Sequence, residues 1–210
     1  MKYLLTFITL LFFISVNAQR IEYIDPDAHL SAEEREDKRL KGQKHTLKWI
    51  GASFRMYPGF HQLKKIPPMH CGMSGIDYLL GNRDSTVLIA LTLDPRDSAM
   101  YKRDTIWTRM MKGYTPDDQW LLHFRANVDS SSFKPVLYSQ KELKKYNADA
   151  GGELKKNCKH FYLEKYLVRR SIILNKKYRG IILIHYFTKE NDNRDISRYI
   201  KNSSKMIHYN

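Results

Sequence analysis

The chain has 210 residues, of which 42% are apolar and 28% are charged, and its formal net charge is +14. This composition is that of an ordinary globular protein, and it excludes a low-complexity chain. The excess of positive charge indicates attraction to anionic partners, although net charge alone does not define a specific site.

The first eighteen residues have the pattern of a signal peptide. Lys2 supplies a positive start, residues 3–16 form an apolar run, and small residues precede Gln19. We therefore predict cleavage near Ala18 and a secreted or periplasmic protein. Residues 19–210 are predicted to form a single α+β domain, and the removal of Lys2 lowers its net charge to +13. We expect no membrane span after cleavage, because no later segment is long and apolar enough.

The N-terminal part of the domain contains one strong helix signal. Residues 20–24 alternate polar and apolar side chains, which indicates a strand. Residues 29–42 are predicted to form a helix that begins with a capping box of Ser31 and Glu34 and ends at Gly42. Residues 45–56 fit a helix and a strand equally well.

Two strands and a second helix are predicted in the middle of the chain. Residues 85–93 form a short aliphatic run that is typical of a buried strand. Residues 119–128 alternate with a period of two, which predicts a strand with one buried side. Residues 139–152 predict a short helix, opened by a capping box of Ser139 and Glu142 and followed by a glycine-containing loop.

The last sixty residues predict a hairpin followed by a helix. Residues 166–174 and 180–188 are two apolar strands joined by a polar turn, and the second is apolar on both faces. Residues 191–209 predict a helix with a short strand at residues 205–209. A hairpin without alternating crossover units favours an α+β fold, in which a few helices pack on an antiparallel sheet.

Cys71 and Cys158 are the two cysteines of the chain, and export would expose both to an oxidising environment. We predict that they form a disulfide bond, since an even number of cysteines in an exported protein is typical of bridging. The alternative within the structural class is two separately buried thiols.

A catalytic role for Cys71 is a second interpretation. The segment 70–80 could place the thiol just before a helix, where the helix dipole lowers a cysteine pKa. Asn147 or Asp149 could orient a partner histidine, and the candidates for that histidine are His123, His160 and His185. His185 lies in an apolar run, which favours a core histidine over a base.

A zinc site is a third interpretation, with His70, Cys71, Cys158 and His160 as the possible ligands. The paired spacings that are usual in structural zinc sites are missing. We therefore predict no metal, no cofactor and no catalytic residue.

The C-terminal half is both basic and rich in tyrosine. Residues 19–100 hold 12 basic and 11 acidic side chains, whereas residues 101–210 hold 23 basic and 11 acidic ones and ten of the 14 tyrosines. Tyrosine and arginine can stack on ligand rings while cations hold anionic groups. The predicted binding residues are Lys159, Tyr162, Tyr166, Arg169, Lys177, Tyr178 and Arg179.

These patterns predict a non-enzymatic binding or interaction module of the periplasm or the extracellular space. Its expected partner is an anionic envelope component or a protein, and export makes nucleic acid a poor candidate. The alternative is a small cysteine-dependent hydrolase that acts on an envelope polymer.

Overall fold

The computed structural model of the chain describes residues 26–63, 75–99, 120–121, 135–155, 166–189 and 195–210. Its helices are α2 (Ala32–Ile50), α5 (Gln140–Tyr146), α6 (Ser197–Lys201) and α7 (Ser203–Met206). The strands are β1 (Ala52–Phe54), β2 (Phe60–Gln62), β3 (Tyr78–Asn82), β4 (Val87–Pro95), β5 (Val136–Leu137), β6 (Ala150–Lys155), β7 (Tyr166–Lys176), β8 (Gly180–Lys189) and β9 (Ile207–Tyr209). The chain divides into two compact units, Met1–Lys38 and Arg39–Asn210.

In the first unit, a capping box begins α2, as the sequence predicts. The Ser31 hydroxyl accepts a hydrogen bond from the Glu34 amide at 3.2 Å, and the Glu34 carboxylate accepts one from the Ser31 amide at 2.7 Å. Hydrogen bonds from the backbone and the side chain of Ser31 to the Glu34 carboxylate lower the pKa of Glu34. The capping box satisfies two backbone donors that a helix start would otherwise leave unpaired.

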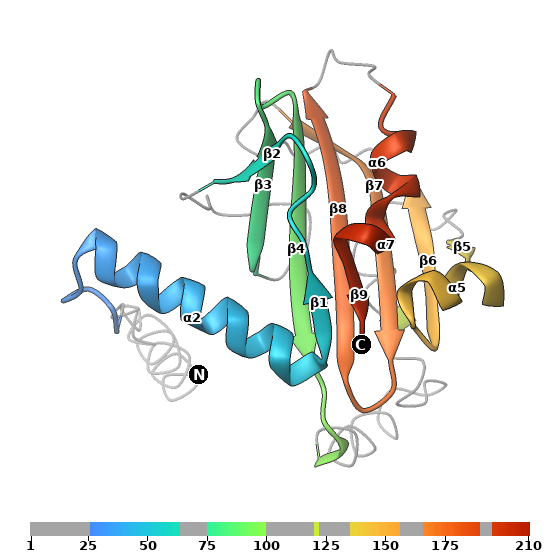
Figure 1. Cartoon of the computed structure of the whole chain (residues 1–210), viewed down its shortest axis with the longest axis horizontal. Coiled ribbons are helices and arrows are strands. Elements are labelled where there is room, and N and C mark those ends of the chain that lie inside the picture. Colours follow the sequence, from blue (N-terminus) through green and yellow to red (C-terminus); the bar gives the residue numbers. More distant parts are fainter. Residues whose placement is uncertain (1–25, 64–74, 100–119, 122–134, 156–165, 190–194) are drawn as a thin grey trace, which may run out of the picture. The chain divides into compact units, whose positions relative to one another are not determined.

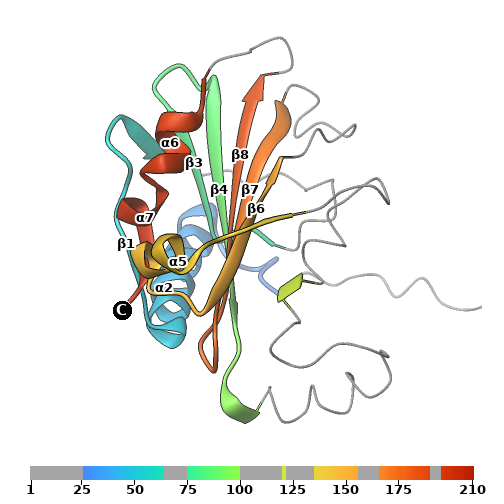
Figure 2. The same cartoon turned by 90° about the vertical axis from the view of Figure 1, so that its right-hand side faces the viewer.

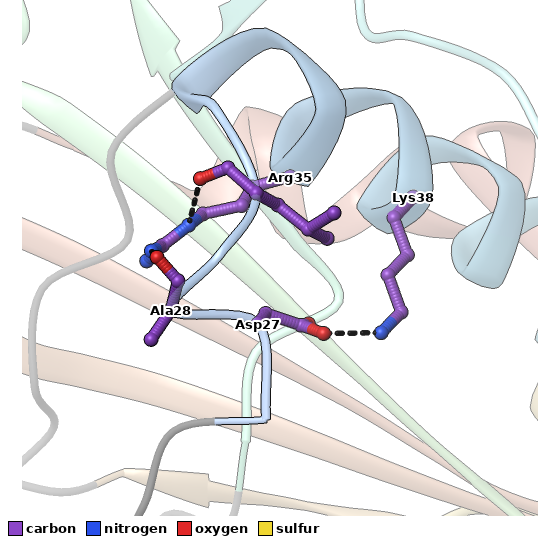
Figure 3. A network of polar contacts seen from close by, with 5 residues as sticks. Asp27, Ala28, Arg35 and Lys38 are labelled. Atoms are coloured by element: carbon purple, nitrogen blue, oxygen red, sulfur yellow. Dashed lines mark hydrogen bonds and ion pairs between the residues drawn. The ribbon is translucent and has the colours of Figure 1, made fainter.

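Two long side chains of α2 reach back to the turn that precedes the helix (Figure 3). Arg35 donates to the carbonyl oxygens of Leu30 and Ala28, each at 3.1 Å. Lys38 forms an ion pair with Asp27. The first turns of α2 are therefore tied to residues 27–30.

The second unit contains a seven-stranded antiparallel sheet in the order β2-β3-β4-β8-β7-β6-β5, counted over the described residues (Figure 1). β4 and β8 are the central pair, in register from Val87 with Thr188 to Pro95 with Gly180. A separate two-stranded sheet pairs β1 with β9 in antiparallel orientation. The antiparallel α+β fold and the C-terminal hairpin followed by helices confirm the predicted fold class.

Both faces of the central strand β8 are buried, which explains why its sequence is apolar throughout. Ile182, Ile184 and Tyr186 face the main core, which they share with residues of β1, β9, α5 and α7. Ile181 and Leu183 pack on the other face, in a cluster that also holds Trp120. Figure 2 shows α5, α6, α7 and β1 on one side of the sheet.

The glycine at position 42 does not end the first helix, which corrects the predicted boundary. α2 continues to Ile50, and the left-handed residue that follows is Gly51, with φ of 62°. The cost of an interior glycine is about 1 kcal/mol. Burial of Gln43 and Ile50 against the sheet outweighs this local preference.

Three further predictions differ from the structure. Trp120 and Leu121 are helical rather than extended, and the rest of the predicted strand 119–128 lies outside the described residues. Gly151 and Gly152 belong to β6, not to a loop. A side chain at Gly151 would collide with the backbone of β7. Residues 78–82, after Cys71, form strand β3 and not a helix. The predicted strand 20–24 lies outside the described part.

No helix in the described part of the chain is long and apolar enough to cross a membrane.

Candidate binding cleft

A cleft of about 530 Å³ opens between the loop after β1 and the helices α6 and α7. We call it the basic cleft, and its lining residues are Arg55, Met56, Tyr57, Pro58, Arg198, Tyr199, Asn202, Lys205 and Met206. The first four form one wall, and the other five form the opposite, helical wall. All nine lie in the second unit.

The small β1–β9 sheet positions both walls. The last residue pair of its ladder joins Phe54 to Ile207, and the amide of Arg55 extends the ladder by donating to the carbonyl of Met206 at 2.8 Å. The wall of residues 55–58 therefore begins directly after β1, and the helical wall ends directly before β9. Two segments about 140 residues apart in sequence are joined by backbone hydrogen bonds at the base of the cleft.

Three aromatic rings fix the position of the two tyrosines in the cleft. Tyr57 and Tyr199 approach each other edge to face across the cleft, with centroids 5.4 Å apart. Each also packs edge to face on Phe60, at 5.5 and 5.3 Å. Phe60 is buried, so it anchors both rings to the core. Perpendicular aromatic pairs of this kind are favourable beyond their buried area, and here they hold the rings in place before any ligand arrives.

Among the lining residues that the structure describes, every charged side chain is a cation. Arg55, Arg198 and Lys205 are exposed, and no ion pair involves any of them among the described residues. The acidic residue nearest in sequence, Asp195, instead accepts a hydrogen bond from the Ser197 amide at 2.8 Å. Hydrogen bonds from Ser197 lower the pKa of Asp195. The cleft therefore presents positive charge on both walls, and none of its described lining residues is acidic.

Buried hydroxyl groups hold the helical wall against the core. Tyr146 of α5 and Ser203 of α7 are buried, and their hydroxyl oxygens lie 2.5 Å apart. Ser203 donates to the carbonyl of Ile200 at 2.6 Å, which leaves its oxygen to accept the Tyr146 proton. Burial raises the pKa of Tyr146, so its proton stays on the phenol at neutral pH. The hydrogen bond between Tyr146 and Ser203 thereby joins helix α7 to α5.

The predicted binding residues do not gather in one place among those that the structure describes. Tyr166 is buried at the start of β7, and its hydroxyl donates to the carbonyl of Ser85. The turn 177–179 lies at the opposite end of that strand, about 35 Å away at the usual strand rise. Arg169 belongs to β7, at an irregularity in its pairing with β8. Lys159 and Tyr162 lie outside the described residues.

The turn between β7 and β8 remains a candidate surface of its own. Tyr178 is 53% exposed and has a left-handed backbone, with φ of 60°. The Lys177 ammonium lies 5.3 Å from the centroid of the Tyr178 ring, and the Lys177 amide donates to Asp149 at 2.8 Å. The Arg179 side chain lies against Gly51. The role of this turn in binding stays a prediction.

Cys71, Cys158, His70, His123 and His160 all lie outside the described residues, so the predicted disulfide and its alternatives stay untested. Within the described ranges, no cluster of three His, Cys, Asp or Glu side chains could hold a metal ion.

The residues proposed to assist a catalytic cysteine have structural partners. His185 is buried in β8, and its Nδ1 lies 2.7 Å from the Ser171 hydroxyl, which confirms it as a core histidine. Asn147 ends α5 in a left-handed conformation, and Lys176 donates to its side chain at 2.9 Å. Asp149 binds the Lys177 amide.

The predicted binding residues include none of the residues that line the basic cleft. A signal for one wall is present in the sequence, because the run Ser197–Lys201 is aromatic and basic and contains Arg198 and Tyr199. Nothing in the sequence indicates that residues 55–58 lie opposite, because that proximity depends on the pairing of β1 with β9. Comparison with protein-family models, with curated proteins and with solved structures finds no match to this chain.

Proposed function

We propose that this protein is a non-enzymatic binding module and that the basic cleft is where it holds an anionic ligand. The observation that carries the proposal is the arrangement of Arg55 on one wall and Arg198 and Lys205 on the other, around two fixed tyrosine rings. Guanidinium groups match carboxylate and phosphate oxygens in geometry, and an ammonium adds a mobile positive charge.

The fixed walls support binding because few side chains have to become ordered when a ligand enters. Tyr57 and Tyr199 are already packed on Phe60, and α7 is already bonded to α5 through Ser203. A preorganised site avoids much of the entropy cost of ordering side chains on association. A volume of about 530 Å³ lies within the range of clefts that bind small molecules or short polymer segments.

We further infer that the protein acts outside the cytoplasm. The support is the signal-peptide pattern of residues 1–18, and the basic C-terminal half is then available to anionic envelope components or to a protein partner. Nucleic acid is a poorer candidate in that compartment.

The test compares two triple variants with the same loss of charge. The cleft variant combines Arg55→Ala, Arg198→Ala and Lys205→Ala. The control variant combines Lys44→Ala, Lys141→Ala and Lys144→Ala, which are exposed lysines of α2 and α5 outside the cleft lining. Binding of heparin, of poly-glutamate and of vesicles containing phosphatidylglycerol is measured by calorimetry or interferometry at ~0.15 M and ~0.5 M salt, where screening lengths are roughly 8 and 4 Å.

We expect at least one probe to bind and to lose about tenfold or more in affinity with the cleft variant, since each hydrogen bond to a charged group contributes about 1.5–3 kcal/mol. The control variant should change the affinity by less than about threefold, as expected of exposed charges away from the site. Equal losses in both variants would mean that only diffuse surface charge is involved, and binding of no probe would also contradict the proposal.

A further inference from the structure

We propose that the ligand of the basic cleft is an acidic peptide segment with an apolar side chain between its carboxylates. This inference rests on the proposed function and adds the chemical class of the partner. In this arrangement the apolar side chain packs against the paired rings of Tyr57 and Tyr199. The carboxylates on either side of it meet Arg55 and Arg198 on the two walls.

The residue types of the lining are those of protein–protein interfaces. Six of the nine lining residues are arginine, tyrosine or methionine. These types are enriched at the centres of interfaces, and tyrosine and arginine dominate binding energies there. Lysine is depleted at such centres, and the single lysine of the cleft is exposed.

An apolar floor explains why a purely polar ligand is a poorer fit. Met206 is 2% exposed and Met56 is half-buried, and both line the cleft together with the two tyrosines. Methionine is flexible and polarisable, so it adapts to apolar side chains of different shape. Burying such a side chain removes apolar surface from water, which favours binding.

The lining also supplies many more hydrogen-bond donors than acceptors. Arginine and lysine side chains only donate, and the acceptors of the lining side chains are the Asn202 amide and the two phenol oxygens. A sugar hydroxyl accepts hydrogen bonds but also needs an acceptor for its own proton, whereas an ionised carboxylate only accepts. The donor excess therefore favours the carboxylates of a peptide over the hydroxyl groups of a polysaccharide.

The experiment selects random twelve-residue peptides by display on the purified wild-type protein and, in parallel, on the triple cleft variant. The best wild-type peptide is then synthesised in three forms: the selected sequence, one with every Asp and Glu changed to Asn and Gln, and one with its apolar residue changed to Ser. Fluorescence anisotropy measures the affinity of each form, with heparin and phosphatidylglycerol vesicles as non-peptide anions.

We expect selected peptides to carry acidic residues on both sides of an apolar residue and to be lost from the cleft-variant selection. Neutralising the acids should weaken binding by about tenfold or more, and changing the apolar residue to Ser should weaken it by about fivefold or more. Met56→Ala should reduce peptide binding, because Met56 lines the cleft. Thermal unfolding of each variant verifies that it is folded.

The outcomes separate this inference from the proposed function. Selected peptides without acidic bias, or peptides indifferent to the apolar residue, would overturn the inference. Binding of heparin or vesicles through the cleft, with no peptide selected, would refute the peptide as ligand and leave the proposed function in place. Binding of no anion of any class would refute both.

Discussion

Asp77 is a single residue whose carboxylate links two central strands. It lies directly before β3, and its Oδ2 accepts a hydrogen bond from the Leu93 amide of β4 at 2.7 Å. Burial raises the pKa of Asp77, and the neighbouring Asp94 raises it further. Burial and the adjacent Asp77 also raise the pKa of Tyr78 to about 12. Asp77 is therefore harder to ionise in the folded state than in the unfolded chain.

Two substitutions of Asp77 should separate its hydrogen bond from its charge. Asp77→Ala leaves the Leu93 amide without this acceptor, so we expect the free energy of unfolding to fall by about 1–3 kcal/mol. Asp77→Asn keeps an acceptor and removes the charge. Urea unfolding of both variants and of the wild type, followed from pH 3.5 to pH 7, measures the effects.

The sign of the pH dependence follows from the raised pKa. Protonated Asp77 favours the folded state, so its contribution to stability is full below the ordinary aspartate pKa and is lost as the pH rises through the raised value. The stability of Asp77→Asn relative to wild type should therefore increase with pH over that window. A relative stability that is flat, or that decreases with pH, would contradict this account.

At the scale of elements, the two capping boxes illustrate what local sequence predicts well. Ser31 with Glu34, and Ser139 with Glu142, form the reciprocal hydrogen bonds that their spacing predicts. Each box involves residues three apart, so no distant contact is needed to form it. Local sequence predicts the ends of helices less reliably than their starts. The end of α2, for example, depends on which side chains its last two turns bury.

Two glycines with opposite surroundings test how far local preference and distant contacts determine the elements. Gly42 is exposed inside α2, and a side-chain carbon added there would meet no neighbouring atom within 4 Å. Gly180, in contrast, has φ of 140° and lies against the backbone of Asp94 and Pro95. Gly42→Ala should raise the free energy of unfolding by about 0.5–1 kcal/mol, because alanine favours the helix. Gly180→Ala should lower it by about 2–4 kcal/mol through strain and overpacking.

Chemical denaturation compares the two glycine variants, and far-ultraviolet circular dichroism reports helix content. A loss of stability in Gly42→Ala would mean that this part of α2 is not a regular exposed helix. A neutral Gly180→Ala would mean that the β7–β8 turn relaxes freely, in conflict with its close contact to β4.

For the second unit as a whole, Tyr209 joins the two sheets. It is 1% exposed, and its hydroxyl donates to the carbonyl oxygens of Leu174 in β7 and Gly180 in β8, at 3.2 and 2.8 Å. The same core cluster contains residues of β1, β9 and the large sheet. The strand that supports the basic cleft is therefore part of the main core.

Tyr209→Phe should lower the free energy of unfolding by about 1–2 kcal/mol, because two buried acceptors lose a donor while the ring still fills its space. The matched control is Tyr178→Phe at the exposed β7–β8 turn, where we expect a change within about 0.5 kcal/mol. Urea unfolding followed by tryptophan fluorescence and by circular dichroism should give coincident transitions in both variants. A Tyr209→Phe protein as stable as wild type would show that the hydroxyl does not couple the sheets.

The sequence alone determined the features that depend on neighbouring residues: the two capping boxes, the strands β4, β7 and β8, and the antiparallel α+β class. These follow from periodicity and from side chains within a few residues of one another. Only the tertiary structure decided where α2 ends, why Gly151 lies in a strand, and that Arg55 and Tyr57 face Arg198 and Tyr199. Each of these depends on burial or strand pairing between distant segments, and such contacts leave no periodic signal in either segment by itself.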